Sequence, residues 1–175
     1  MRINVNELRN ELDGTMSFQW GLLAPEDFKD RIEDIVVTFT AKYTDESIVI
    51  KGYLSMVYKT QCDRCIKPTS IKVGEKFEEE FRRGSPPQPE ETEIVLEKED
   101  LSVDYFTGNS LELDDYFRQV IILSIPDKVL CRKDCPGLCP ECGQDLSLAD
   151  CGCQKESVDP RLKKLEKFKE IIQEN

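Results

Sequence analysis

The chain has 175 residues and a formal net charge of −11 at pH 7, with 24 basic residues, 35 acidic residues and no histidine. This length suits one domain with a tail or two small modules, and the acidity excludes a general nucleic-acid binder, so any RNA contact must be local. The missing histidine excludes Ser-His and Cys-His catalysis and histidine metal ligands. Residues 1–7 lack a signal-peptide pattern and no apolar run approaches the roughly 18 residues of a membrane span. We therefore expect a cytoplasmic protein.

Hydrophobic periodicity changes from helical to strand-like along the first eighty residues. Residues 3–12 carry apolar side chains at helical spacing, which predicts a short amphipathic opening helix. Residues 35–43 and 48–58 alternate apolar and polar side chains on either side of a polar turn, so they predict a hairpin, and the alternation resumes over 71–81. Gly52 interrupts the second strand of the hairpin and indicates a bulge.

An acidic stretch occupies residues 75–104, where eleven acids and four bases give a net charge of −7. The prolines within it predict an acidic, Pro-rich loop at 84–93, because proline lacks the N–H that a central strand needs. The simplest interpretation of this stretch is a solvated loop and strand face. The alternative is a surface that docks a basic partner.

Two helices are predicted beyond the loop. Residues 101–106 predict one more strand, and Asn109 with Glu112 has the spacing of a capping box before an apolar stripe that ends at Pro126. Asp159, followed by proline, predicts the start of a C-terminal helix. The predicted fold class is α+β: an antiparallel β-meander or partly open barrel packed by one long helix, with a Cys-rich zinc-knuckle region and a C-terminal helix.

The eight cysteines fall into four close pairs: Cys62 and Cys65, Cys131 and Cys135, Cys139 and Cys142, and Cys151 and Cys153. Closely spaced thiolates bind structural zinc, which takes four ligands in a tetrahedron, so the eight residues supply two complete sites. Gly143, directly after the third pair, is typical of a knuckle turn. We expect two Zn²⁺ ions as cofactors, in closed sites without an open position for catalysis.

Other uses of the cysteines fit the sequence less well. Disulfides need an oxidising compartment. A thioredoxin-like site needs a helix N-terminus next to its thiols, whereas Cys62 and Cys65 lie between two predicted strands. Radical iron–sulfur enzymes share one of the spacings, but this chain lacks the repeated strand and helix units of their barrels. A rubredoxin-like iron or thiol redox protein remains the alternative, because iron knuckles have the same spacing.

Four close pairs can combine into two sites in three ways. One combination groups Cys139, Cys142, Cys151 and Cys153, which lie within fifteen residues. Closing a site over so short a segment costs little chain entropy. The second site would then contain Cys62, Cys65, Cys131 and Cys135. This combination divides the chain into an α+β core at 1–130 and a zinc-knuckle module with the C-terminal helix at 131–175, linked through the Cys62/Cys65 site.

Several motifs resemble a known family. They are Cys62-Asp63-Arg64-Cys65 with Pro68, Ser124-Ile125-Pro126, the run from Gly137 through Cys139-Pro140-Glu141-Cys142-Gly143 to Leu146, and Asp159-Pro160-Arg161-Leu162. Together they are similar to the YceD family, which is named for large ribosomal RNA subunit accumulation. The resemblance implies a role in 23S rRNA accumulation or large-subunit assembly in the bacterial cytoplasm, and it brings no enzymatic activity with it.

Under that resemblance the expected partner is ribosomal RNA or a basic large-subunit ribosomal protein, with no membrane and no small-molecule substrate. The residues expected to contact RNA are Arg132, Lys133, Arg161, Lys163, Lys164 and Lys167. Most of them lie in the C-terminal helix, whose residues 160–172 carry a local charge of +3. The alternative is a solvated helix face on which lysine and glutamate form weak pairs.

Overall fold

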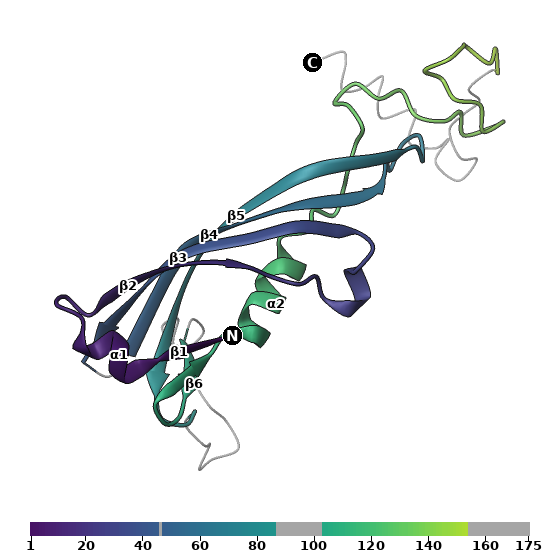
Figure 1. Cartoon of the computed structure of the whole chain (residues 1–175). Helices are drawn as coiled ribbons and strands as arrows, with labels where there is room; N and C mark the ends of the chain where they lie inside the picture. Colours follow the sequence, from purple (N-terminus) through teal and green to yellow (C-terminus); the bar gives the residue numbers. More distant parts are fainter. Residues whose placement is uncertain (46, 87–102, 154–175) are drawn as a thin grey trace, which may run out of the picture.

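The structure is a computed structural model, and it describes residues 1–45, 47–86 and 103–153. Its main feature is an open five-stranded sheet in the order β2-β3-β4-β5-β6 (Figure 1). These strands are β2 Thr15–Gly21, β3 Ile32–Thr44, β4 Ser47–Gln61, β5 Pro68–Arg83 and β6 Val103–Phe106. Consecutive strands from β2 to β5 pair antiparallel, which confirms the meander, but β6 pairs parallel with β5. The sheet is therefore mixed, with β2 and β6 as its two edges, and the alternative of a partly open barrel is not confirmed.

Gly52 lies in the middle of the sheet, in unbroken register between Phe39 and Phe77. The bulge expected at Gly52 is therefore absent, and the nearest register shift falls between Glu33 and Val36. A Cβ atom at position 52 would lie 2.4 Å from Cβ of Phe39 and 2.7 Å from Cζ of Phe77. Glycine is required here because two core aromatic side chains approach the backbone from the neighbouring strands.

Strand β2 was not anticipated by the sequence analysis, although Met16, Phe18 and Trp20 alternate along it. Phe18 stacks on Phe39 of β3 and Trp20 meets the same ring edge-on, each with its ring centroid 5.1 Å from that of Phe39. The backbone pairing of β2 with β3 continues one residue beyond the end of β2, because the N–H of Leu22 donates to the carbonyl of Ile35 over 3.0 Å. A short 3-10 helix, η1 (Glu26–Phe28), then leads into β3.

The opening helix is shorter than predicted. Residues Arg2–Asn4 form a strand, β1, and the helix α1 covers only Val5–Asn10, with the side chain of Asn4 accepting from the N–H of Asn6. The strand partner of β1 is β7 (Ser110–Glu112), which pairs Ile3 with Leu111. Both of these apolar side chains are buried, so the long-range pairing outweighs the local helical pattern at residues 3 and 4.

The predicted capping box at Asn109 is also wrong, and the predicted long helix is short. Pairing of β7 with β1 occupies residues 110–112, so α2 begins only at Asp114 and ends at Leu123. The backbone carbonyl of Asn109 accepts from Val5, and its side chain accepts from Arg83 instead of capping α2. The helix nevertheless places the predicted apolar stripe toward the sheet.

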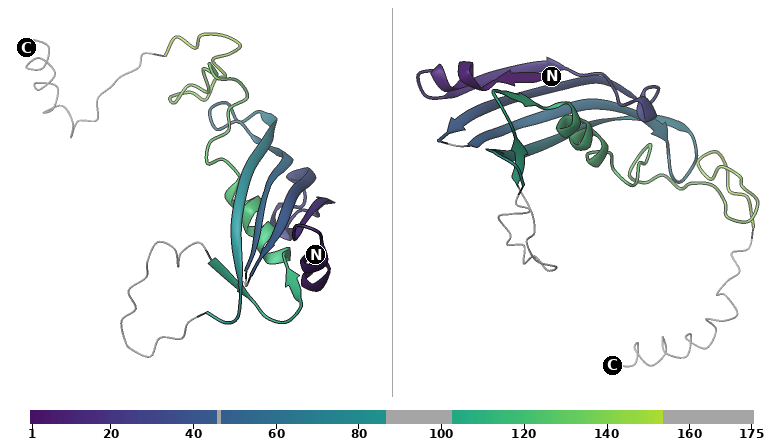
Figure 2. Two further views of the ribbon diagram at one scale, coloured as in Figure 1. Left: turned by 90° about the vertical axis from the view of Figure 1, so that its left-hand side faces the viewer. Right: turned by 90° about the horizontal axis from the view of Figure 1, so that it is seen from below.

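One face of the sheet carries the hydrophobic core. Phe117 of α2 lies on it, with its ring centroid 5.4 Å from those of Phe39 and Phe77, and Ile121 is buried one turn further on. Figure 2 shows α2 against this face, whereas no element among the described residues covers the opposite face. The predicted C-terminal helix and most of the 84–93 loop lie outside the described residues. No helix within the described ranges is long and apolar enough to cross a membrane.

Candidate metal centres

The eight cysteines gather into two clusters of four. Cluster I contains Cys62, Cys65, Cys131 and Cys135, and cluster II contains Cys139, Cys142, Cys151 and Cys153. Within each cluster all sulfur atoms lie within 4.8 Å of one another, and all eight residues are free thiols. The grouping is the one that loop-closure entropy favours among the three possible combinations.

The sulfur spacing in cluster I fits a tetrahedral metal ion. Four sulfurs at about 2.3 Å from a central zinc stand about 3.8 Å from one another. The structure places the sulfur of Cys62 at 3.8 Å from that of Cys135, and the sulfur of Cys65 at 3.7 Å from that of Cys131. A sulfur–sulfur bond is about 2.0 Å long, so this spacing suits four ligands around one ion rather than two disulfides.

Cluster I joins two segments that are far apart in the sequence. The turn between β4 and β5 supplies Cys62 and Cys65, and the chain beyond α2 returns to the end of this hairpin to supply the other two thiols (Figure 1). Asp63 fixes the returning chain, because its N–H donates to the carbonyl of Val129 and its carboxylate accepts from the N–H of the same residue. Three of the four thiols are buried, so the cluster forms a small core of its own.

The turn of cluster I has a strained backbone. The N–H of Cys62 donates to the carbonyl of Lys67 over 2.9 Å, and the N–H of Ile66 donates to the carbonyl of Cys62 over 2.8 Å. Ile66 adopts a φ of 61°, a left-handed conformation that is unfavourable for a β-branched side chain. Such strain persists where the surroundings impose it, and here the turn directs both thiols to one point.

Cluster II has the same local geometry with a glycine in the strained position. Gly143 follows Cys142 as Ile66 follows Cys65, and its φ is 73°. Its N–H donates to the carbonyl of Cys139 over 2.9 Å, which closes the knuckle turn. Both turns therefore follow one knuckle pattern, and the sequence signal at Gly143 correctly marked the second of them.

Contacts between the two clusters hold the knuckle against the end of the hairpin. The N–H of Leu138 donates to the carbonyl of Arg64 over 2.9 Å, and the guanidinium of Arg64 donates to the carbonyl of Cys135 over 2.8 Å. Gly137 adopts a φ of 81° beneath this contact, where a Cβ atom would lie 2.9 Å from the carbonyl oxygen of Arg64. The Gly-Leu step of the motif is thus a close backbone packing site.

A salt bridge adds to this attachment. Lys67, at the base of the hairpin turn, pairs with Asp145 of the knuckle, and Asp145 also accepts from the N–H and hydroxyl of Ser147. Lys67 and then Ser147 lower the pKa of Asp145 to about 2. A carboxylate with a lowered pKa stabilises the folded chain above about pH 4, and this contribution is lost as the pH falls toward 2.

Each cluster combines one easily ionised thiol with others that resist ionisation. The backbone N–H of Cys131 lowers the pKa of Cys62 to about 6, and the backbone N–H of Cys142 lowers the pKa of Cys139 to about 7. Loss of surrounding water raises the pKa of Cys131 to about 12, and the neighbouring thiol of Cys142 raises that of Cys153 to about 12. A divalent cation is the partner that favours four thiolates at once.

The expected RNA-contacting residues are only partly described. Arg132 and Lys133 are both exposed on the segment between Cys131 and Cys135, and Arg132 lies 3.7 Å from the carboxylate of Asp134. The remaining four residues of that prediction, Arg161, Lys163, Lys164 and Lys167, lie outside the described residues. The structure therefore places Arg132 and Lys133 on the surface beside cluster I.

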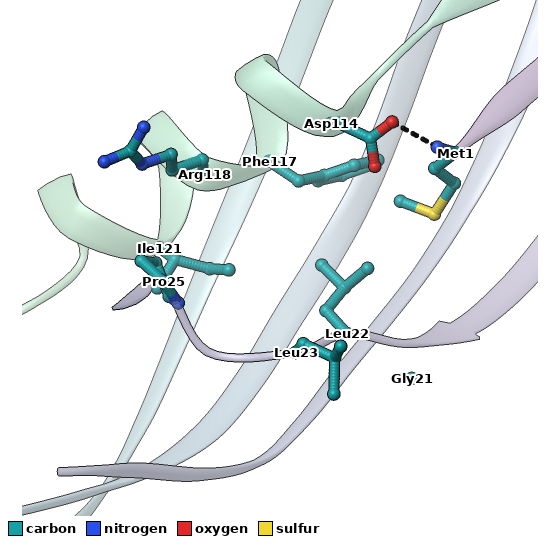
Figure 3. A pocket seen from close by; sticks show the side chains of 9 residues that line it. All are labelled: Met1, Gly21, Leu22, Leu23, Pro25, Asp114, Phe117, Arg118 and Ile121. Atoms are coloured by element: carbon teal, nitrogen blue, oxygen red, sulfur yellow. Dashed lines mark hydrogen bonds and ion pairs between the residues drawn. The ribbon is translucent and has the colours of Figure 1, made fainter. Parts of the chain in front are cut away.

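A pocket of about 380 Å³ lies apart from both clusters, between the end of β2 and α2 (Figure 3). Its charged groups already have partners, because the N-terminal ammonium of Met1 pairs with Asp114 and Arg118 lies 3.5 Å from Asp27. Phe117 and Ile121 form much of its apolar wall. We assign no ligand to this pocket.

Comparison with known proteins adds a family to this geometry. The family model described as "Large ribosomal RNA subunit accumulation protein YceD" matches residues 50–169, which include both cysteine clusters. The chain belongs to the YceD family. No solved structure matches it.

The relatives found are mycobacterial proteins whose names say only that they are uncharacterized. Proteins of Mycobacterium tuberculosis and Mycobacterium bovis are 31% identical over 120 residues, which cover 69% of this chain and 55% of the relatives. A protein of Mycobacterium leprae is 25% identical over 147 residues, covering 84% of this chain and 59% of the relative. The chain thus spans little more than half the length of these relatives.

Proposed function

We propose that the chain is a zinc-stabilised, non-enzymatic factor in large ribosomal subunit biogenesis. It acts in the bacterial cytoplasm and supports accumulation of 23S rRNA by binding ribosomal RNA, a basic large-subunit protein or both. Family membership supports the ribosomal part of this proposal. The observation that carries the metal part is the pair of four-cysteine clusters, each with its sulfurs within 4.8 Å of one another.

The closed character of the clusters supports a structural rather than catalytic metal. Catalytic zinc keeps one position open for water or substrate, whereas four protein thiolates fill a tetrahedral ion. Cluster I joins the end of the sheet to the chain beyond α2, so the free energy of metal binding becomes free energy of folding. A rubredoxin-like iron would occupy the same ligands and remains the second candidate for the metal.

The first test is the metal content of the full chain. Protein purified without chelators should contain close to two zinc ions and eight reduced thiols, and it should be colourless. Elemental analysis with thiol counting measures both quantities, and a red protein containing iron would favour the rubredoxin-like alternative. Reproducible disulfides, or a chain that binds neither metal, would contradict the two-site proposal.

The second test concerns the partner. Changing Lys163, Lys164 and Lys167 together to Gln should weaken association with large-subunit precursors and reduce its dependence on salt, because each lost phosphate contact removes about one released counterion. Changing Glu78, Glu79 and Glu80 to Gln should instead slow association with a basic ribosomal protein. Co-sedimentation with precursor particles at two salt concentrations separates these outcomes. Wild-type association of both variants would place recognition on another surface.

A further inference from the structure

The sheet face opposite α2 is uncovered throughout the described part of the chain. Its side chains are the odd-numbered positions of β2, the even-numbered positions of β3 from 36 to 42, the odd-numbered positions of β4 from 49 to 59, the even-numbered positions of β5 from 70 to 82, and Val103 and Tyr105 of β6. We call this surface the open face. Because strand residues alternate between faces, it excludes the buried phenylalanines that pack under α2.

The open face is positively charged, although the chain as a whole is strongly acidic. It has six basic side chains and two acidic ones, and Glu33 at its border lowers the net charge to +3, against −11 for the entire chain. The basic side chains are Lys42, Lys51, Lys59, Lys72, Lys76 and Arg82. The fold therefore concentrates, on one surface, a positive charge that is scattered through the sequence.

Several of these bases are available to a partner. Lys51 pairs with Glu78 over 2.7 Å, and Lys59 pairs with Glu33. Lys42, Lys72 and Lys76 are exposed, and none of them forms a salt bridge with another described residue. Lys72 and Lys76 lie four residues apart on β5, and Lys42 lies two strands away on β3, so the three cations are suited to contact separate phosphates along one strand of RNA.

An exposed aromatic side chain lies among the lysines. Tyr53 of β4 stands opposite Lys76 on β5 and Thr38 on β3, and it is 47% exposed. Its side chain lies across Gly74, where a Cβ atom would come within 1.7 Å of the tyrosine hydroxyl oxygen. Glycine at that position lets the ring rest on the sheet surface, so the aromatic group is held in place without being buried.

We propose that the open face binds single-stranded RNA, with a base stacked on Tyr53 and phosphates held by Lys42, Lys72 and Lys76. The proposal rests on the proposed role in ribosomal RNA accumulation and adds the open face, besides the C-terminal lysines, as a surface that contacts RNA. Proteins that bind single strands combine aromatic platforms with basic grooves, because every base has a stacking face and every nucleotide a phosphate. A duplex offers no unstacked base to such a platform.

The composition of the open face favours RNA over a protein partner. Protein interfaces concentrate binding energy in a desolvated centre of large apolar and aromatic residues, surrounded by a polar rim. Here Tyr53 is the one aromatic side chain on the central strands of the open face, its neighbours Thr38 and Lys76 are polar, and Tyr105 lies at the β6 edge beside Arg82. An aromatic group with polar and ammonium neighbours suits a base and its phosphates better than an apolar protein surface.

The test uses the 175-residue chain loaded with zinc and a fluorescent oligouridylate of about 12 nucleotides, a length within the usual range for one binding surface. Tyr53→Leu should weaken binding about fivefold or more, because leucine keeps apolar bulk but cannot stack. The double variant Lys72→Gln, Lys76→Gln should bind more weakly. The slope of log binding constant against log salt concentration should become shallower by about 1.4, because each phosphate contact on a single strand contributes about 0.7. The matched control, Lys29→Gln with Lys128→Gln, removes two exposed charges elsewhere and should bind as the wild type does.

Association of the same variants with large-subunit precursors separates the possible failures. If the wild type binds the oligouridylate and the open-face variants bind it equally well, the open face is not the RNA site. If the variants lose association with precursors while the wild type does not bind the oligouridylate, the face contacts a protein and the RNA assignment is wrong. If the wild-type chain associates with neither precursors nor RNA, the proposed ribosomal function itself fails. Unchanged thermal unfolding of all variants verifies that each one folds.

Discussion

Of the two metal ions proposed for the clusters, Cys62→Ser should release about one, and it should unfold the hairpin end of the sheet. Cys62 is 1% exposed, and its cluster joins residues 73 positions apart in the sequence. Structural zinc contributes about 10–16 kcal/mol of binding free energy in small zinc domains, so partial loss of such a term should lower Tm by about 10 °C or more. Elemental analysis and thermal unfolding measure the two effects.

The matched variant is Cys151→Ser in cluster II. It should also release about one metal ion, but it should leave the main thermal transition of the sheet nearly unchanged, because cluster II closes within residues 139–153. Near-ultraviolet circular dichroism follows the aromatic core that surrounds Phe39 and reports directly on the sheet. Equal losses of Tm in both variants, or release of the same ion by both, would contradict the two-cluster assignment.

The parts of the fold that sequence analysis predicted well are those determined by local patterns. The alternation along residues 35–43, 48–58 and 71–81 reflects burial of every second side chain, so β3, β4 and β5 were predicted in the correct order and direction. Their true lengths are greater, because strand pairing continues past the apolar residues to the turn that holds Cys62. The grouping of the cysteines was predicted for a similar reason, since loop closure is cheapest for near neighbours.

The incorrect predictions concern elements that depend on distant contacts. Strand β7 has only three residues and exists because Leu111 pairs with Ile3, more than a hundred positions away. That pairing removes the residues from which the capping box at Asn109 would have formed. The parallel direction of β6 likewise depends on its docking beside β5 and has no local sequence signal.

Candidate sites show the same division between local and distant information. The knuckle at Gly143 has the glycine that its left-handed backbone favours, so the sequence marks it. The equivalent position in the first turn is Ile66, a residue that argues against a left-handed conformation, and only the structure reveals the similarity of the two turns. The open face was missed because its lysines are spread over three strands and become neighbours only in the folded sheet.

Gly137→Ala should destabilise the attachment of the knuckle to the hairpin much more than Gly143→Ala. Both glycines have left-handed backbones, with φ of 81° and 73°, so both substitutions lose about 1 kcal/mol through backbone conformation. Only at position 137 would the new methyl group also collide with backbone, 2.9 Å from the carbonyl oxygen of Arg64, whereas nothing lies within 4 Å of a Cβ atom at position 143. The carbonyl of Arg64 accepts the hydrogen bond from Leu138, so relief of the collision must weaken that contact.

The expected result is a loss of about 3 kcal/mol or more for Gly137→Ala and about 1 kcal/mol for Gly143→Ala, since a backbone atom cannot move aside as a flexible side chain can. Metal release to a chromophoric chelator should be faster in Gly137→Ala, because the returning chain that supplies Cys131 and Cys135 is held against the turn through Arg64. Denaturant unfolding measures the stability difference, and the chelator assay measures access to cluster I. Equal effects of the two substitutions would mean that backbone conformation alone governs both positions and that the contact with Arg64 does not hold the two clusters together.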